Sequence, residues 1–99
     1  MKRAKGYWVA HVSATDPVAY RQYAEGATAA FAKYGAKVLA RGGHTRNLEG
    51  AAHERNVVIE FESIDAAQRC YDSPEYQAAR IHRVNAAIIQ LMLVEGVSE

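Results

Sequence analysis

The sequence predicts a single α+β domain over residues 1–99, in which two helices cover one face of a four-stranded antiparallel sheet. Three observations lead to this fold class. Four segments are rich in apolar, β-branched and aromatic residues, as strands are. Two longer segments between them carry apolar residues at helical spacing. The chain has 99 residues and no linker, repeat or low-complexity tract, which is enough for one thin core and too little for two.

The first strand and the first helix are expected over residues 5–14 and 17–34. Asp16 can cap the free N–H groups of this helix, and Pro17 suits its first position because proline has no N–H to satisfy. Gly35 follows where a left-handed C-terminal cap is needed. The apolar stripe of the helix consists of Tyr20, Tyr23, Ala24, Ala27, Ala30, Phe31 and Tyr34.

The second half of the chain predicts three further strands and an interrupted helix. Ser63 can cap a short helix that runs through Tyr71. Ser73 and Pro74 can then start a new helical segment, so the second helix should break near Asp72. The remaining strands are expected over residues 36–41, 56–62 and 87–94.

The order of elements is therefore β-α-β-β-α-β. Two right-handed β-α-β crossovers place the first and third strands at the centre of the sheet and the second and fourth at its edges. The consecutive Val57, Val58 and Ile59 suit a central strand that is buried on both faces. This arrangement is the ferredoxin-like sandwich, and it leaves one face of the sheet without helices, here called the open face.

Charge and composition exclude several classes of protein. Twelve Lys and Arg against eleven Asp and Glu leave a formal net charge of +1, so no strong field would attract nucleic acid or an acidic membrane. An RNA-recognition sheet needs aromatic residues on its third strand, and here only Phe61 is available, on the helix-covered face. The apolar runs are too short to cross a bilayer and no signal-peptide stretch follows the basic start, which predicts a cytoplasmic protein.

The residues that bind metals or act as nucleophiles form no known motif. The four histidines have no metal-ligand spacing, so neither a metal nor a cofactor is expected. His44 and His53 flank one long loop and should be solvated. Cys70 is the only cysteine, which suits a reducing compartment, and it lies on an apolar helical stripe, where a buried structural thiol is expected.

The open face predicts an interface. Side chains alternate across a strand, so Val57, Ile59 and Phe61 should face the helices while their neighbours face away. Such a surface is too apolar for a bare monomer and too charged for a dry core, which predicts a homodimer closing a mixed cleft that could hold a small molecule. The open face should carry Tyr7, Val9, His11, Lys37, Leu39, Arg41, Val58, Glu60, Ile88, Gln90 and Met92.

If the cleft is catalytic, His11 is the expected proton carrier, because imidazole titrates near neutral pH. Glu60 would orient a cation or share a proton. The candidate substrate-binding residues are Tyr7, Lys37, Arg41 and Gln90, of which Arg41 or Lys37 would hold an anionic group.

The alternation of side chains along each strand, together with a turn centred near Leu48, predicts which residues pair across neighbouring strands. The first and third strands are expected to run parallel, which places His11 and Glu60 near one end of the sheet and Tyr7 and Arg41 near the other. The cleft would then have two polar ends around an apolar waist. The expected cross-strand pairs are Lys37–Glu60, Leu39–Val58, Arg41–Asn56, Tyr7–Met92, Val9–Gln90 and His11–Ile88.

Several blocks along nearly the whole chain are distinctive in combination. They are KGYWVAHV, Thr15-Asp16-Pro17 with Tyr20 and Tyr23, FAKYGAKVLARGG, Leu48-Glu49-Gly50, VVIEFES, and YDSPEYQAAR with Arg83 and Val94-Glu95-Gly96. Together they resemble the domain of unknown function 1330 family, of the dimeric α/β-barrel superfamily. The chain departs from that family in having Ala36 for a common Gly, Glu62 for a usual Pro, and Cys70 for a usual Trp, which alters packing in the second helix.

The resemblance implies a ferredoxin-like protomer and a homodimer whose sheets pack face to face, and it implies no established reaction. Superfamily relatives include cofactor-free monooxygenases, muconolactone isomerases and haem-degrading enzymes, which is an analogy of fold alone. Two functions stay open: a small-molecule-binding dimer that could be an enzyme, and a structural or regulatory dimerisation module. Haem binding through His82 or His11 is a third, and an unchanged Soret band on adding haemin would remove it.

Overall fold

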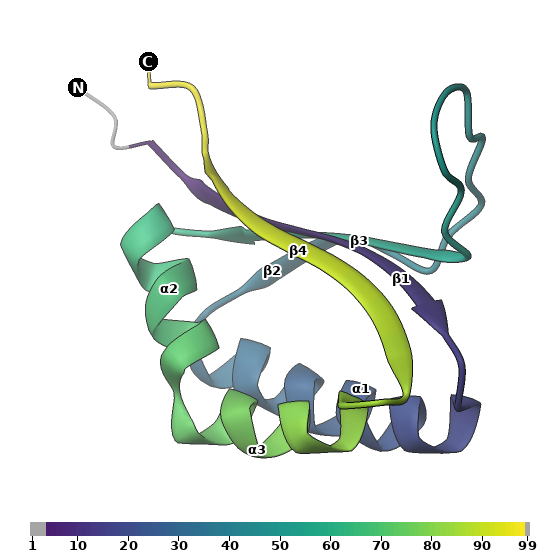
Figure 1. Cartoon of the computed structure of the whole chain (residues 1–99). Coiled ribbons are helices and arrows are strands. Elements are labelled where there is room, and N and C mark those ends of the chain that lie inside the picture. The colour runs from purple at the N-terminus through teal and green to yellow at the C-terminus, as the bar shows by residue number, and fades with distance from the viewer. Residues whose placement is uncertain (1–3, 99) are drawn as a thin grey trace.

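The computed structural model describes residues 4–98, which form four strands and three helices. All three helices lie on one side of a strongly twisted sheet (Figure 1). This is the predicted ferredoxin-like arrangement, with the second helix divided into two. The elements are β1 (Gly6–Ala14), α1 (Pro17–Lys33), β2 (Lys37–Arg41), β3 (Arg55–Phe61), α2 (Ile64–Asp72), α3 (Pro74–Arg83) and β4 (Ala87–Glu95).

The strand order is β2-β3-β1-β4, so β1 and β3 are central as predicted. Every neighbouring pair is antiparallel, and the expectation that β1 and β3 run parallel is wrong. The crossover through α1 makes β1 and β2 point the same way, and the β2–β3 connection then reverses the chain. β3 must therefore oppose β1.

The helix ends follow from the capping residues. The Asp16 carboxylate accepts the Ala19 N–H at 3.2 Å, and Gly35 has a left-handed φ of 70° just after α1. Ser73 both ends α2 and begins α3: its hydroxyl donates to the Cys70 carbonyl and accepts the Tyr76 N–H. This double role confirms the predicted break near Asp72.

The core lies between the sheet and the helices and centres on Trp8, which is 1% exposed. The rings of Phe31 and Tyr76 meet its indole edge-on, at centroid distances of 5.1 and 4.9 Å, and Phe61 stacks at 6.0 Å. The predicted helix-facing sets of β1 and β3 are confirmed. They are Trp8, Ala10, Val12, Val57, Ile59 and Phe61, all buried.

A bulge in β2 changes which face its last residues occupy. Lys37 pairs with Glu60 as predicted, but Ala40 pairs with Val58 and Arg41 with Val57. The extra residue lies between Val38 and Ala40 and reverses the alternation beyond it. The placement of Arg41 on the open face is therefore wrong, as are the pairs Leu39–Val58 and Arg41–Asn56.

The β1–β4 register differs from the expectation by two residues. The observed pairs on the open face are Tyr7–Val94, Val9–Met92 and His11–Gln90. A shift of two keeps every side chain on its predicted face, so the alternation of polarity could not detect it. No short turn joins β1 to β4, so no turn geometry fixes this register.

Candidate functional site

The open face has a polar group at each end, but the members differ from those expected. At one end the Tyr7 hydroxyl donates to a Glu60 carboxylate oxygen at 3.2 Å, and Lys37 lies opposite Glu60. His11 lies at the other end, paired with Asn56, because β1 and β3 are antiparallel. His11 and Glu60 therefore form no pair.

The His11 end is a small hydrogen-bonded network. The Asn56 amide nitrogen donates to the His53 carbonyl at 3.1 Å, which turns the amide oxygen toward His11 Nδ1, 2.6 Å away. The Ser13 hydroxyl lies 3.1 Å from His53 Nδ1. His53 lies in the loop as expected but is half-buried, whereas His44 is exposed as expected.

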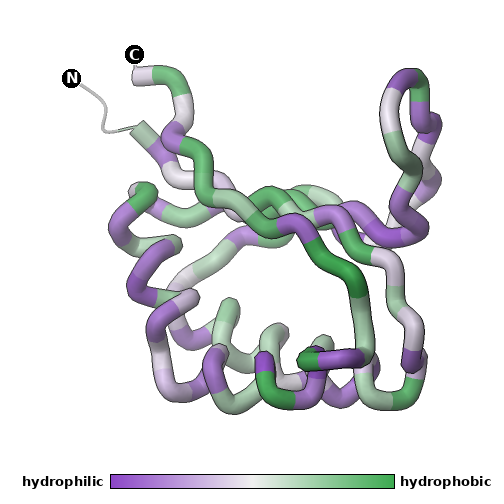
Figure 2. The backbone as a smooth tube through the Cα atoms, viewed as in Figure 1, coloured by the Kyte–Doolittle hydropathy of each residue, from purple (hydrophilic) through white to green (hydrophobic). Residues whose placement is uncertain are grey.

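Between these ends lies an apolar waist that no element of the described chain covers. Val9 stands between Val58 on one side and Met92 on the other. On the edge strand β4, Ile88 is 63% exposed and Met92 53%. Figure 2 shows β4 as mainly hydrophobic along its length. The loop between β2 and β3 rises on this side of the sheet, away from the helices (Figure 1).

A cavity of about 210 Å³ lies on the opposite face, between the sheet and α1. Its buried walls are aromatic and aliphatic. Sequence reasoning did not identify this cavity, because its size depends on how far the twisted sheet stands from the helix. Its lining residues are Trp8, Ala10, Val12, Tyr20, Arg21, Tyr23, Ala24, Glu25, Ala27, Thr28, Phe31, Arg41, Arg55, Val57 and Ile89.

The charged residues of this cavity are its more exposed members, so they mark its mouth. They are three arginines, Arg21, Arg41 and Arg55, and one carboxylate, Glu25. Within residues 4–98 none of these arginines forms an ion pair. The mouth is therefore positive.

Two of the arginines are positioned by neighbours. The Arg41 guanidinium donates to the Thr28 hydroxyl at 3.5 Å, and the Arg55 guanidinium carbon lies 5.5 Å from the Tyr20 ring centroid. Arg41 therefore contacts α1, and Arg55 lies over the Tyr20 ring in the cavity wall. Arg55 occupies the same alternating positions of β3 as Val57, Ile59 and Phe61, which face the helices. This alternation could have predicted that Arg55 also faces the helices.

The tyrosines of the cavity stay protonated near neutral pH. Burial raises the pKa of Tyr20 and, far more, that of Tyr23, whose hydroxyl lies 2.8 Å from that of Tyr76. These phenols can donate hydrogen bonds but cannot act as bases. The phenols of the cavity are thus suited to bind and orient a molecule.

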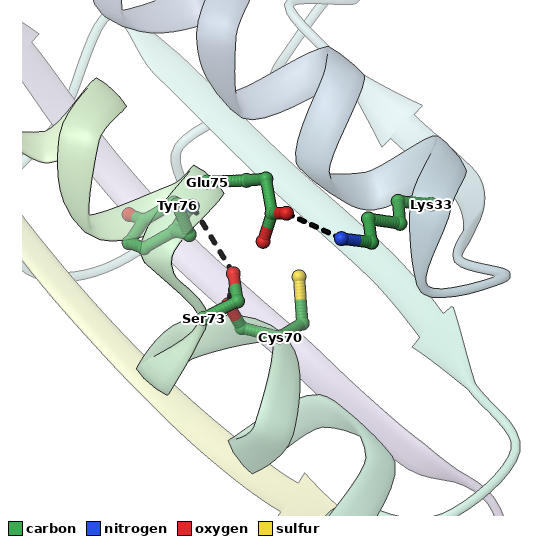
Figure 3. Close-up of polar contacts among 5 residues, drawn as sticks. All are labelled: Lys33, Cys70, Ser73, Glu75 and Tyr76. Atoms are coloured by element: carbon green, nitrogen blue, oxygen red, sulfur yellow. Dashed lines mark hydrogen bonds and ion pairs between the residues drawn. The ribbon is translucent and has the colours of Figure 1, made fainter.

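A third cluster joins α1, α2 and α3 (Figure 3). Lys33 forms an ion pair with Glu75, and the Cys70 thiol points toward the space between them. Burial, and then the Glu75 carboxylate, raises the pKa of Cys70 to about 11. Cys70 is fully buried, so the prediction of a buried structural thiol is confirmed in its burial.

Among residues 4–98, no three His, Cys, Asp or Glu side chains gather as metal ligands would. No helix formed by residues 4–98 is both long enough and apolar enough to span a bilayer.

Residues 5–97 match the family described as "Domain of unknown function (DUF1330)". The chain belongs to the DUF1330 family. No curated protein matches this sequence significantly. The description of the DUF1330 family assigns no activity.

Solved structures share the fold of this DUF1330 chain at low identity. The RPA0582 protein of unknown function from Rhodopseudomonas palustris has a TM-score of 0.78 at 19% identity, covering 99% of this chain and 86% of that one. A dimeric ferredoxin-like protein of unknown function from Bacteroides fragilis has a TM-score of 0.63 at 15% identity, with coverages of 92% and 95%. SnoaB, a cofactor-independent oxygenase from Streptomyces nogalater, has a TM-score of 0.62 at 15% identity, with coverages of 97% and 96%.

Proposed function

We propose that this DUF1330 protein is a homodimer in which each protomer binds a small aromatic carboxylate in the cavity beneath α1. One observation carries the proposal: buried aromatic walls meet a mouth that holds three arginines and one carboxylate. Pockets for small molecules combine such apolar walls with a few polar groups that fix orientation.

The two parts of the cavity suit the two parts of such a ligand. A ring can pack against the aromatic walls formed by Trp8, Tyr23 and Phe31. The guanidinium groups of Arg41 and Arg55 can then form charge-assisted hydrogen bonds with the carboxylate. A cavity of about 210 Å³ favours a ligand with a single ring.

The open face supplies the dimer interface in this proposal. Ile88 and Met92 are more than half exposed there, and the polar ends around the waist give a second copy hydrogen-bonding groups to match. Neighbours from Bacteroides fragilis and Thermobifida fusca are described as dimeric, which supports the same assembly here.

The sequence-derived roles of the open-face residues are kept within this proposal. His11 remains the candidate proton carrier, and Glu60 the residue that would orient a cation or share a proton, now at opposite ends of the interface. The earlier binding candidates are divided: Tyr7, Lys37 and Gln90 belong to the open face, whereas Arg41 moves to the cavity. A reaction needing both His11 and Glu60 on one substrate is not part of the proposal.

A thermal-shift titration with benzoate and benzamide tests the ligand. Benzoate should raise Tm in proportion to the logarithm of its concentration, and the uncharged benzamide should do so more weakly. Arg41→Gln should weaken benzoate binding by about tenfold, the value of one charge-assisted hydrogen bond. Arg46→Gln, in the exposed loop, is the matched control and should leave benzoate binding unchanged.

Two results would overturn the ligand assignment. One is equal stabilisation by benzoate and benzamide. The other is an equal loss of benzoate affinity in Arg41→Gln and Arg46→Gln. Benzoate affinity would then depend on the net charge of the protein and not on Arg41 itself.

A further inference from the structure

A second cavity, of about 360 Å³, lies at the other edge of the sheet, where α2 and α3 pass β4. Ile89 lines both this cavity and the one beneath α1, so the two are neighbours on the helix-covered side. The lining residues of the second cavity are Gln68, Tyr71, Arg80, Arg83, Ile89, Leu91, Met92 and Leu93.

Arg83 is the unusual member of this lining, because its side chain is buried. It is only 8% exposed. One guanidinium nitrogen reaches the Tyr76 hydroxyl at 3.5 Å, a long contact, and the guanidinium carbon lies 5.1 Å from the Tyr23 ring centroid. Its Nε is buried and has no hydrogen-bond partner among residues 4–98.

The positive charge of Arg83 has no counter-charge in the described chain. No carboxylate of residues 4–98 lies within ion-pairing distance of it, and the cavity lining contains no Asp or Glu. Arg80 adds a second guanidinium to the same lining. A buried cation is normally paired, because leaving it unpaired is costly, so the missing partner points to an anion from outside the chain.

We propose that this second cavity binds an aliphatic carboxylate of intermediate chain length. Its carboxylate would meet Arg83 and Arg80, whose forked donors match that shape. The alkyl chain would lie along Ile89, Leu91 and Leu93, the apolar side of the lining. This site is separate from the cavity beneath α1, and neither proposal depends on the other.

The test compares hexanoate, acetate and hexanol as ligands of the full chain. Binding is measured from the change in amide chemical shifts and in Tm. Hexanoate should bind at least about tenfold more tightly than acetate, because acetate lacks the longer alkyl chain. It should also bind at least about tenfold more tightly than hexanol, because hexanol lacks the charge. The amide chemical shifts that hexanoate changes should belong to α3 and β4. Benzoate shifts on α1, β2 and β3 report the first cavity, so either assignment can fail alone.

Two variants and a control separate ligand recognition from folding. Arg83→Met should raise Tm in anion-free buffer, because it removes a buried unpaired charge, and should abolish stabilisation by hexanoate. Arg80→Gln, at a half-buried position, should fold normally and weaken hexanoate binding by about tenfold. Arg69→Gln, exposed on α2 and outside the lining, should match the wild type.

The opposite pattern would overturn the proposal. If Arg83→Met lowers Tm while Arg80→Gln binds hexanoate as the wild type does, Arg83 serves only to pack against Tyr23 and Tyr76. Hexanoate shifts confined to α1 and β2 would likewise refute the second site.

Discussion

Arg41 pairs with Val57 across the β2–β3 ladder, and because Val57 faces the helices, Arg41 reaches the cavity beneath α1. The bulge between Val38 and Ala40 produces this placement. A regular strand of the same length would have put Arg41 on the open face, beside the proposed dimer interface. One inserted residue thus decides which of two surfaces receives a positive charge.

Deleting Leu39 should therefore remove the bulge and leave Arg41 in the cavity. Ala40 would follow Val38 directly and keep its pairing with Val58, so Arg41 would stay opposite Val57 and benzoate should bind as tightly as it does to the wild type. Deleting Leu48, which is 89% exposed in the neighbouring loop, is the control for a one-residue deletion. Isothermal titration gives the affinities, and a loss of benzoate affinity of about tenfold in the Leu39 deletion alone would contradict the role given to the bulge.

Val58→Asp should convert the proposed dimer to a monomer. The side chain lies at the waist of the open face, and an unpaired carboxylate in that interface costs several kcal/mol, roughly 3–5. Ile81→Asp, at a 71% exposed position on α3, adds the same charge elsewhere and should remain dimeric. Light scattering measures the mass, and a wild-type chain that is monomeric at all micromolar concentrations would refute the dimer.

Gly6 of β1 leaves no room for a side chain. A Cβ there would lie 2.5 Å from Ile64 Cα, so the start of α2 would have to move. Gly6→Ala should cost about 2 kcal/mol, or roughly 10 °C in Tm. Gly43→Ala, with no heavy atom within 4 Å of its Cβ, should change Tm little. Equal Tm values for the two variants would show that β1 and α2 are not packed this closely.

Local chemistry explains which features the sequence could predict. Capping by Asp16 and Ser73 and the alternation of β1 and β3 depend on residues close in the chain, so they were predictable. The bulge at Leu39 has no glycine or proline to mark it, and a shift of two in the β1–β4 register leaves polarity unchanged. Both cavities depend on the spacing between sheet and helices, which no local pattern encodes.

Cys70 should resist thiol reagents while the chain is folded. A pKa of about 11 leaves roughly one thiolate in a thousand at pH 8, against about a quarter for a free thiol. Labelling of the native protein should thus be at least about a hundredfold slower than in guanidinium, and it should accelerate as pH rises toward 11. Equally fast labelling of native and unfolded chains would contradict the burial of this thiol.

The stability of the fold should fall above pH 10. Burial raises the pKa of Tyr23 and Tyr76 in the folded chain above the ordinary value near 10, so the unfolded chain releases protons that the folded chain retains. Their contribution is complete below pH 10 and declines above it, by about 1.4 kcal/mol per pH unit for each phenol. Urea midpoints between pH 8 and 11 measure this decline.

A pair of tyrosine variants assigns the alkaline decline to these buried phenols. Tyr23→Phe removes one ionising group from the hydrogen-bonded pair, so its stability should start lower and then fall less steeply above pH 10. Tyr34 lies outside that pair, so Tyr34→Phe should keep the wild-type slope of stability against pH. If Tyr23→Phe declines as steeply as Tyr34→Phe, the loss of stability comes from other groups, such as the Lys33–Glu75 ion pair, in which Glu75 raises the pKa of Lys33.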